Sequence, residues 1–275
     1  MAAIWGRGFG CEVARHPTSI GRVKVTVRLF AIPRERAGRD EMELELPEGA
    51  TTSDALALIA EQPSLTELVE RLPLAMAVNR DYATTDQQLR EGDELAVVPP
   101  VSGGAETASD PDAEPTQPSP ESPDAPQVHA LVAADPISAQ AVTELVGQPH
   151  AGAIVTFQGT TRDVDRLDYE AYTEMAVERI EAILLDAVAN HGLAAAAAEH
   201  RVGEVPLGEP SVVVAVSAAH RPEAFAGARE AIDRIKAEAP IWKREVEITD
   251  EGESGHWVEG TLPSEAVRPP AAAAD

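Results

Sequence analysis

Lysine and cysteine are scarce in this chain of 275 residues. The lysines are Lys24, Lys236 and Lys243, and the one cysteine is Cys11. A single cysteine excludes an internal disulfide and a zinc site built from several thiolates. Arginine carries the rest of the positive charge, and it holds its proton too tightly for proton transfer or amine nucleophilic chemistry. Where lysine does occur, we expect a titratable amine to be needed.

Positive charge as a whole is also scarce, because the formal net charge is -25. A chain without a basic stripe is a poor partner for nucleic acid or anionic lipid, so an anionic ligand would need a local basic pocket. The sequence has no apolar run of about 18 residues, as a membrane span would need, and residues 1–10 lack the apolar core of a secretory signal. We therefore expect a cytoplasmic protein.

Composition divides the chain into two folded domains. Residues 105–127 contain six prolines, six acidic residues and no basic residue, which predicts a disordered linker. Residues 1–22 show no periodicity and predict an unstructured extension, which leaves the true start residue open. Residues 264–275 predict a disordered tail. The folded domains are then expected at 23–104 and 128–263.

The first domain has the pattern of a small α+β unit. Apolar residues alternate along 23–29 and 42–46, as in strands with one buried face. Thr52 or Ser53 is expected to cap the following helix. The remaining expected elements are a short helix at 65–72 and strands at 75–78 and 95–98. This order within about 80 residues is typical of a ubiquitin-like fold.

The second domain is also expected to be α+β. The expected strands are 128–132, 153–158, 211–217 and 241–248. Two helices show apolar residues at helical spacing. One carries Ala176, Ile180, Leu184 and Val188, and the other starts at Pro222 and carries Phe225, Ala228, Ile232 and Ile235. Pro240 is expected to end the second helix.

The two C-terminal lysines lie seven positions apart, around a predicted helix end. Lys236 precedes the break at Pro240, and Lys243 follows it on a predicted strand beside Trp242. Such a turn can bring both amines to one cleft, where each ammonium lowers the pKa of the other and the pair attracts an anion. The alternative is two surface lysines whose aliphatic stems lie along the protein.

Two other segments offer groups for an anion. Thr160, Thr161 and Arg162 follow a glycine at the end of a predicted strand, and their side chains could donate to a phosphate. His220 and Arg221 stand at a predicted helix start, where backbone N–H groups and the helix dipole favour negative charge. The alternatives are an ordinary strand-to-loop turn and a capped helix with two solvated side chains.

The first domain ends in Gly103-Gly104, directly before the predicted linker. The pair could be a hinge between the strand and the linker. Alternatively, it could be a tail without side chains, which would thread into a narrow active site once its carboxyl end were free.

Taken together, these segments resemble molybdopterin synthase, with both subunits in one chain. Residues 23–104 resemble the small sulfur-carrier subunit through VKVTVRLFA and VVPPVSGG. The second domain, to about residue 260, resembles the large catalytic subunit through AGAIVTFQGTTRD, YEAYTEMA, HRVGEV, VVAVSAAHRPEAF, IDRIKAEAPIWKRE and HWVEG. The resemblance implies a β-grasp domain followed by an α/β-hammerhead-type catalytic domain.

The resemblance also implies a sulfurtransferase of molybdenum cofactor biosynthesis. Two sulfurs would pass from a thiocarboxylate at Gly104 to cyclic pyranopterin monophosphate, giving the dithiolene of molybdopterin. The implied catalytic residues are Lys236, Lys243 and Gly104. The implied substrate-binding residues are Phe157, Thr160, Thr161, Arg162, His220, Arg221, Arg244 and Glu245. No metal and no tightly bound cofactor are expected. The expected partners are an adenylating sulfur-activation enzyme and a second copy, bound through the C-terminal domain.

One departure from the family pattern matters for the chemistry. Gly104 is joined to Ala105 by a peptide bond and so has no free carboxylate. We therefore hypothesise that the chain is cut after Gly104. Two other interpretations stay open: an uncut scaffold or regulatory fusion, and a lyase that forms a Schiff base between a lysine and a phosphorylated sugar. The sequence also leaves open which lysine is the nucleophile and which the acid or base.

Overall fold

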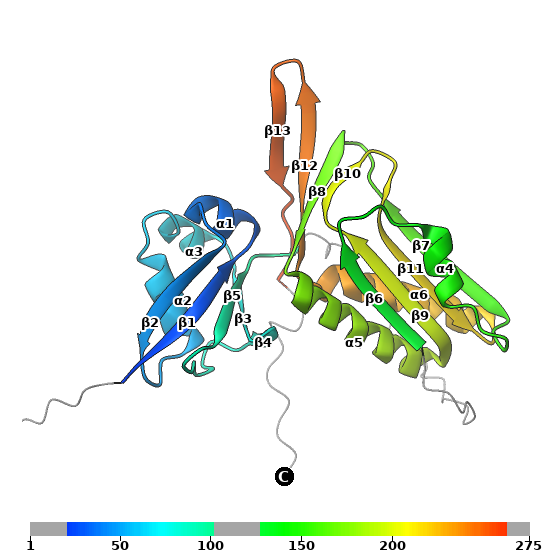
Figure 1. Ribbon diagram of the computed structural model, residues 1–275, viewed down its shortest axis with the longest axis horizontal. Helices are drawn as coiled ribbons and strands as arrows, with labels where there is room; N and C mark the ends of the chain where they lie inside the picture. Colours follow the sequence, from blue (N-terminus) through cyan, green and yellow to red (C-terminus); the bar gives the residue numbers. More distant parts are fainter. Residues whose placement is uncertain (1–20, 102–126, 263–275) are drawn as a thin grey trace, which may run out of the picture.

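The computed structural model describes residues 21–101 and 127–262. These ranges do not include Gly103, Gly104 or the predicted tail. They also leave out nearly all of the predicted N-terminal extension and of the predicted linker. The two described parts form an N-terminal and a C-terminal domain that lie side by side (Figure 1). Among the described residues, no helix is both long enough and apolar enough to span a membrane.

The N-terminal domain is a β-grasp fold. Its elements are β1 (Arg22–Leu29), α1 (Ala31–Ala37), β2 (Glu41–Pro47), α2 (Thr52–Ala60), α3 (Thr66–Arg71), β3 (Ala75–Val78), β4 (Asp81–Ala83) and β5 (Glu94–Val98). The sheet order is β2-β1-β5-β3-β4, and β1 and β5 run parallel at its centre. Thr51, one residue before the predicted cap, caps α2, because it forms a reciprocal capping box with Asp54.

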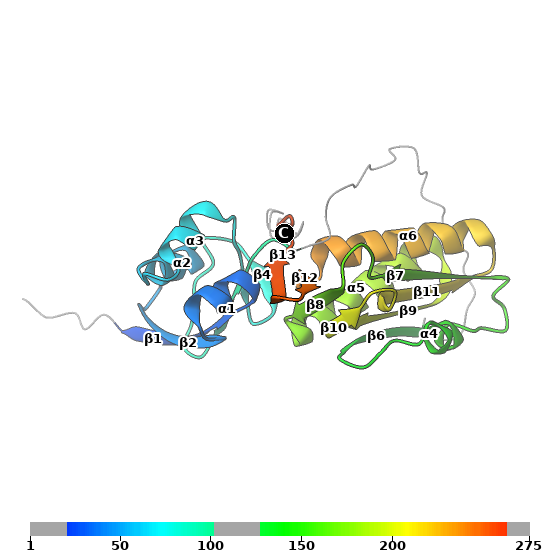
Figure 2. The same cartoon turned by 90° about the horizontal axis from the view of Figure 1, so that it is seen from above.

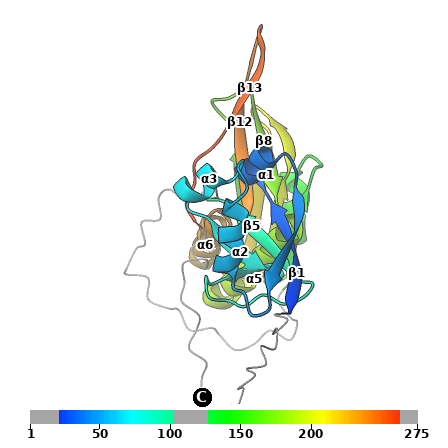
Figure 3. The same ribbon diagram turned by 90° about the vertical axis from the view of Figure 1, so that its left-hand side faces the viewer.

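The C-terminal domain contains two four-stranded sheets. Its elements are β6 (Gln127–Ala133), α4 (Ala139–Leu145), β7 (Ala153–Thr160), β8 (Arg166–Ala171), α5 (Thr173–His191), β9 (Leu193–Arg201), β10 (Gly203–Pro206), β11 (Pro210–Ala218), α6 (Arg221–Glu238), β12 (Ile241–Thr249) and β13 (Gly252–Trp257). One sheet has the order β6-β9-β11-β7 and the other the order β10-β8-β12-β13. Figure 2 shows α6 and α4 on opposite sides of the first sheet, and the β12–β13 hairpin projects away from both domains (Figure 3).

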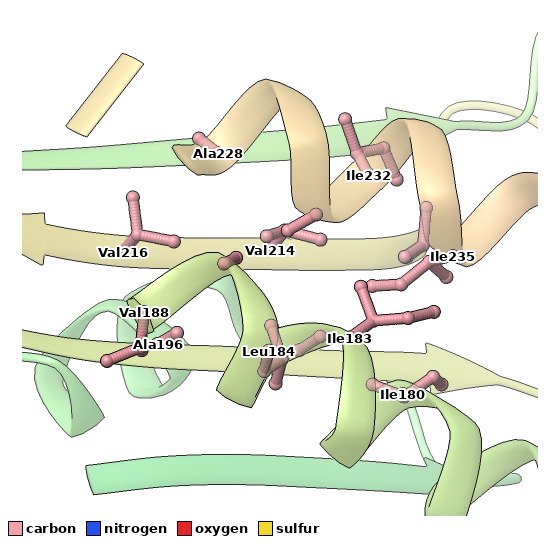
Figure 4. Close-up of a cluster of buried hydrophobic side chains, with 14 of the residues drawn as sticks. Ile180, Ile183, Leu184, Val188, Ala196, Val214, Val216, Ala228, Ile232 and Ile235 are labelled. Atoms are coloured by element: carbon pink, nitrogen blue, oxygen red, sulfur yellow. The ribbon is translucent and has the colours of Figure 1, made fainter. Parts of the chain in front are cut away.

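The two long helices bury most of the faces that their periodicity predicts, but Phe225, on the predicted apolar face of α6, is 64% exposed. Ile180, Leu184 and Val188 of α5 pack with Ile232 and Ile235 of α6 against β9 and β11 (Figure 4). Burial of apolar area at about 25 cal/mol per Å² stabilises this layer. The packing holds the C-terminal end of α6 firmly against the sheet, and this end carries Lys236.

The domains meet through stacked aromatic rings. Phe30 lies between Tyr172 and Trp242, with ring centroids 4.9 Å and 5.3 Å away. Trp242 is 2% exposed, and its indole Nε1 donates to the backbone oxygen of Pro99 at 3.1 Å. Arg34 of α1 pairs with Glu170 of β8 at 2.8 Å. Buried aromatic rings, a hydrogen bond and an ion pair connect the two domains here. Together they fix the orientation of the N-terminal domain on the C-terminal domain.

Candidate active site

A cavity of about 440 Å³ opens where the two sheets of the C-terminal domain meet the end of α6. The lining residues come from the end of β7 and the loop after it, from β8, β9 and the start of β11, and from the α6–β12 turn. They are Gly159, Thr160, Arg162, Asp163, Val164, Leu167, Tyr169, His200, Ser211, Val212, Ile235, Lys236, Ala239, Ile241, Lys243 and Glu245. The cavity is therefore assembled from segments far apart in the sequence.

The turn between α6 and β12 brings both lysines to this cavity. Lys236 lies in the last turn of α6, where a positive side chain favourably meets the negative end of the helix dipole. The chain becomes extended at Ala239, and β12 starts at Ile241. Because side chains alternate along a strand, Lys243 and Glu245 share the cavity face, while Trp242 faces the N-terminal domain.

Electrostatics make Lys243 unusual among the cavity residues. Its side chain is half-buried, and burial is the main reason why its pKa lies below the ordinary lysine value. The neighbouring charges of Lys236 and Arg162 lower this pKa further, whereas Glu245 opposes them by raising it. A lysine with a lowered pKa has a larger fraction of free amine near neutral pH, so Lys243 is suited to nucleophilic or proton-transfer chemistry.

The other cations of the cavity are more exposed. Lys236 is exposed at the rim, and its Nζ lies 5.6 Å from the ring centroid of Phe157, within reach of a cation–π interaction. The Arg162 side chain is 87% exposed and pairs loosely with Asp163 at 3.5 Å. Three cationic side chains around one cavity make a local anion site in a chain whose net charge is strongly negative.

Five of the sequence-predicted residues meet in this cavity. They are Thr160, Arg162, Lys236, Lys243 and Glu245. Phe157 lies next to them, against Lys236. The grouping follows from the topology, since β7 and α6 both end at this edge of the sheet.

The other predicted residues lie elsewhere in this chain. Thr161 is buried, and its hydroxyl donates to the backbone oxygen of Val205 at 3.3 Å. Arg244 points to the opposite face of β12, where its guanidinium covers Gly255. Gly104 falls outside the described residues.

His220 and Arg221 stand at the far end of the domain from the cavity. His220 is the N-cap of α6, as its predicted place at a helix start required, and both side chains are exposed. However, Lys236 lies 15 residues further along the same helix, so roughly 20–25 Å separates the two ends at 1.5 Å per residue. One chain cannot bring His220 and Arg221 to its own cavity.

The N-terminal domain reaches the same strand that carries Lys243. Pro99 accepts the bond from Trp242, and Val101 forms an isolated antiparallel bridge with Thr261, with N–O distances of 2.8 and 3.1 Å. The backbone of Val258 donates to the carbonyl of Lys243 at 3.0 Å. Val101, the last described residue of the N-terminal domain, also packs in the apolar cluster that contains Trp242 of β12.

Comparisons with known proteins divide the chain in the same way. The ThiS family matches residues 27–104, and the MoaE protein family matches residues 132–238. A molybdopterin synthase catalytic subunit from Pyrococcus abyssi is 43% identical over 122 residues, which cover 42% of this chain and 80% of the Pyrococcus protein. The chain belongs to the molybdopterin synthase family. Its two parts are a ThiS-type domain and a MoaE-type domain in one polypeptide, referred to below as the carrier domain and the catalytic domain.

The chain matches two further relatives over different shares of their length. A molybdopterin synthase catalytic subunit from Oryza sativa subsp. indica is 53% identical over 109 residues, or 38% of this chain, and the chain spans 55% of the rice protein. The X-ray crystal structure of molybdopterin synthase from Staphylococcus aureus matches 46% of this chain and 96% of that chain, with 30% identity and a TM-score of 0.42.

Sequence reasoning did not select four polar residues of the cavity: Asp163, Tyr169, His200 and Ser211. Tyr169, His200 and Ser211 do not stand at a predicted strand-to-loop or helix-start position. Asp163, Tyr169 and His200 do lie in AGAIVTFQGTTRD, YEAYTEMA and HRVGEV, three of the strings that carry the family resemblance, and this was the available signal. In the part of the chain that the structure describes, no group of three or more histidine, cysteine or acidic side chains is placed to hold a metal ion.

Proposed function

We propose that this protein is a molybdopterin synthase that works in molybdenum cofactor biosynthesis. It would transfer two sulfurs from a thiocarboxylate on Gly104 to cyclic pyranopterin monophosphate. The observation that carries the proposal is the meeting of Lys236, Lys243 and Arg162 in one cavity, next to the strand on which the carrier domain is seated. The names of the Pyrococcus and rice relatives support the same activity.

The cations suit the proposed substrate. A phosphate monoester is anionic, and Arg162 together with Lys236 offers donors for its oxygens at the cavity rim. Lys243 lies deeper, with a lowered pKa, so its amine would hold a covalent intermediate or move protons at the carbon that receives sulfur. After each transfer Gly104 would be left as a carboxylate, ready for renewed activation by an adenylating enzyme.

The carrier tail would start close to the strand that carries Lys243. Gly104 is three residues beyond Val101, and three extended residues span about 10 Å. Val101 is bridged to Thr261 and packs in one apolar cluster with Trp242 of β12. A free tail ending at Gly104 would therefore operate close to the place where the carrier domain already sits. This requires a cut between Gly104 and Ala105, which remains our hypothesis.

A second copy would complete the site. His220 and Arg221 are too far from the cavity of their own chain to bind its substrate. Exposed apolar side chains lie around them: Phe225 is 64% exposed one helical turn after Arg221, and Ile154 is 47% exposed opposite Ser217 near the end of β11. We propose that this end of the catalytic domain pairs with another copy and supplies His220 and Arg221 to that copy's cavity.

Intact mass spectrometry of the protein from its native host tests the carrier mechanism. We expect two fragments that meet at Gly104 and Ala105, with part of the first fragment carrying sulfur in place of one oxygen. An Ala105 substitution that blocks cutting should abolish sulfur loading. Full sulfur transfer by an uncut chain would overturn the cleavage hypothesis. Borohydride trapping of a sugar phosphate on Lys236 or Lys243, with no need for sulfur, would instead indicate a lyase.

A further inference from the structure

The cavity has an uncharged hydrogen-bonding wall beside its cations, and His200 is its central residue. The His200 ring lines the cavity and is 8% exposed. Its Nδ1 lies 2.9 Å from the backbone oxygen of Arg201. A carbonyl oxygen can only accept, so Nδ1 must carry the proton. In a neutral ring with this tautomer, Nε2 is a lone-pair acceptor.

Burial keeps the ring neutral. It lowers the pKa of His200 to about 4, and the charge of Lys236 acts in the same direction, although the bond to Arg201 opposes both. The ring is also held in place: Tyr169 meets it edge to face at 4.9 Å between centroids. The Tyr169 hydroxyl is tied to Ser211 at 3.1 Å, and Ser211 donates to the Gly159 carbonyl at 3.2 Å.

The acceptor on His200 differs from the carboxylates of the cavity. Asp163 is paired with Arg162, and Glu245 lies 3.4 Å from His256. No residue within the ranges 21–101 and 127–262 donates a hydrogen bond to His200 Nε2. The His200 ring lines the cavity and Nε2 is not sealed from solvent, so a ligand that enters the cavity can donate to Nε2 in place of water. A phosphate dianion has no proton to donate to Nε2. The hydrogen-bond donor to Nε2 must therefore lie on another part of the ligand.

We propose that His200 is a substrate-recognition residue whose Nε2 accepts a ring N–H of a nitrogen heterocycle, while Arg162 and Lys236 hold the anionic group of the same molecule. The inference rests on the proposed function and deepens it. A reduced pterin carries several ring N–H donors, and cyclic pyranopterin monophosphate joins such a ring to a phosphate. Tyr169 is a positioning residue, because it fixes the plane of the imidazole.

Two amide substitutions separate recognition from a structural role. In His200→Gln the amide oxygen can reach the position of Nε2, so the acceptor is kept. In His200→Asn the amide is shorter, so it can replace Nδ1 in the bond to Arg201 but leaves the Nε2 position empty. If Nε2 binds the substrate, Gln should keep the affinity and Asn should lose it. If the ring only supports the Arg201 backbone, the order should be reversed.

Calorimetric titration of the full chain with cyclic pyranopterin monophosphate measures this difference. We expect the Kd of His200→Gln to stay within about threefold of wild type and that of His200→Asn to rise at least about tenfold. Inorganic phosphate is the control probe, and its binding should be equal in all three proteins. Equal or reversed Kd values for Gln and Asn would overturn the inference while leaving the proposed function intact. Failure of the wild-type chain to bind the pterin would overturn both.

A measurement on the wild-type chain avoids any folding defect of the variants. With ¹⁵N-labelled histidine, the Nε2 resonance of neutral His200 should shift when cyclic pyranopterin monophosphate is added and should stay in place with phosphate. The resonance is assigned by its absence in His200→Gln. An Nε2 resonance that does not move on saturation with the pterin would refute the contact.

Discussion

At the scale of single residues, the charges around Lys243 should set the pH dependence of the reaction. If Lys243 acts as a free amine, kcat/KM rises with pH as this amine loses its proton. Lys236→Met removes a charge that lowers the Lys243 pKa, so the acid limb should move to higher pH. Glu245→Gln removes a charge that raises it, so the limb should move to lower pH. Steady-state kinetics across pH measures both.

The position of the limb is the informative quantity in this experiment. Lys236 and Glu245 line the cavity themselves, so either substitution can also reduce the maximum rate. Displacement of both limbs in the same direction would show that another group controls the reaction.

The residues of the site differed in how far the sequence could place them. Lys236 and Lys243 could be predicted because lysine is rare and because both lie next to a predicted helix end. Arg162 could be predicted because it follows the end of a predicted strand. His200 and Tyr169 lie inside strands, and their function depends on which strand is the neighbour. That His220 lies far from Lys236 follows from the length of α6, and the predicted start at Pro222 and end at Pro240 already implied this separation.

At the scale of elements, the approach of α6 to β9 depends on Gly227. A Cβ on Gly227 would lie 2.8 Å from both methyl groups of buried Leu193. Gly227→Ala gains about 1 kcal/mol of helix propensity, but overpacking costs about 1–3 kcal/mol. We expect a net destabilisation of about 1 kcal/mol in urea unfolding. In a Leu193→Ala background the clash is absent, so Gly227→Ala should stabilise the protein; destabilisation there would contradict this account.

Two of the elements missed by sequence reasoning, β9 and β13, have a common physical cause: pairing with neighbouring strands defines them. The strand β9 has the sequence LAAAAAEHR, and alanine favours helices by local propensity. It is a strand because β6 and β11 pair with it on both sides. Likewise, β13 is mostly exposed and lacks an alternating pattern, so pairing with β12 alone identifies it. The helices α5 and α6 could be predicted, because their own apolar spacing determines them.

Between elements, Trp242 should control the docking of the carrier domain. Trp242→Ala removes a buried ring from the aromatic stack and the bond to Pro99, and such truncations cost about 3–5 kcal/mol. With a protease site introduced between residues 105 and 127 and then cut, the wild-type domains should co-elute in gel filtration, whereas the variant domains should separate. Leu185→Ala is the matched control and should behave as wild type, because Leu185 is 43% exposed on α5 and lies outside the aromatic stack. Co-elution of the Trp242→Ala domains would show that the polar contacts are sufficient.

At the scale of the whole molecule, complementation tests whether two copies share each site. Lys243→Ala and the double variant His220→Ala/Arg221→Ala should each have little activity alone. In a mixed dimer, one of the two cavities has an intact lysine together with an intact His220 and Arg221 from the other chain. An equal mixture should therefore recover about a quarter of wild-type activity after subunit exchange. No recovery, with exchange verified by mass, would place His220 and Arg221 outside the reaction.

The strand β12 contacts the carrier domain with one side chain and the cavity with the next, because successive side chains of a strand point to opposite faces. Trp242 seats the carrier domain, and Lys243 faces the cavity. A shift of one residue turns every side chain of a strand to its other face. A single inserted residue ahead of Trp242 would therefore turn the Trp242 indole towards the cavity and the Lys243 amine towards the carrier domain. The protein would then lose both domain docking and catalysis. We therefore expect β12 to tolerate neither an insertion nor a deletion at this point.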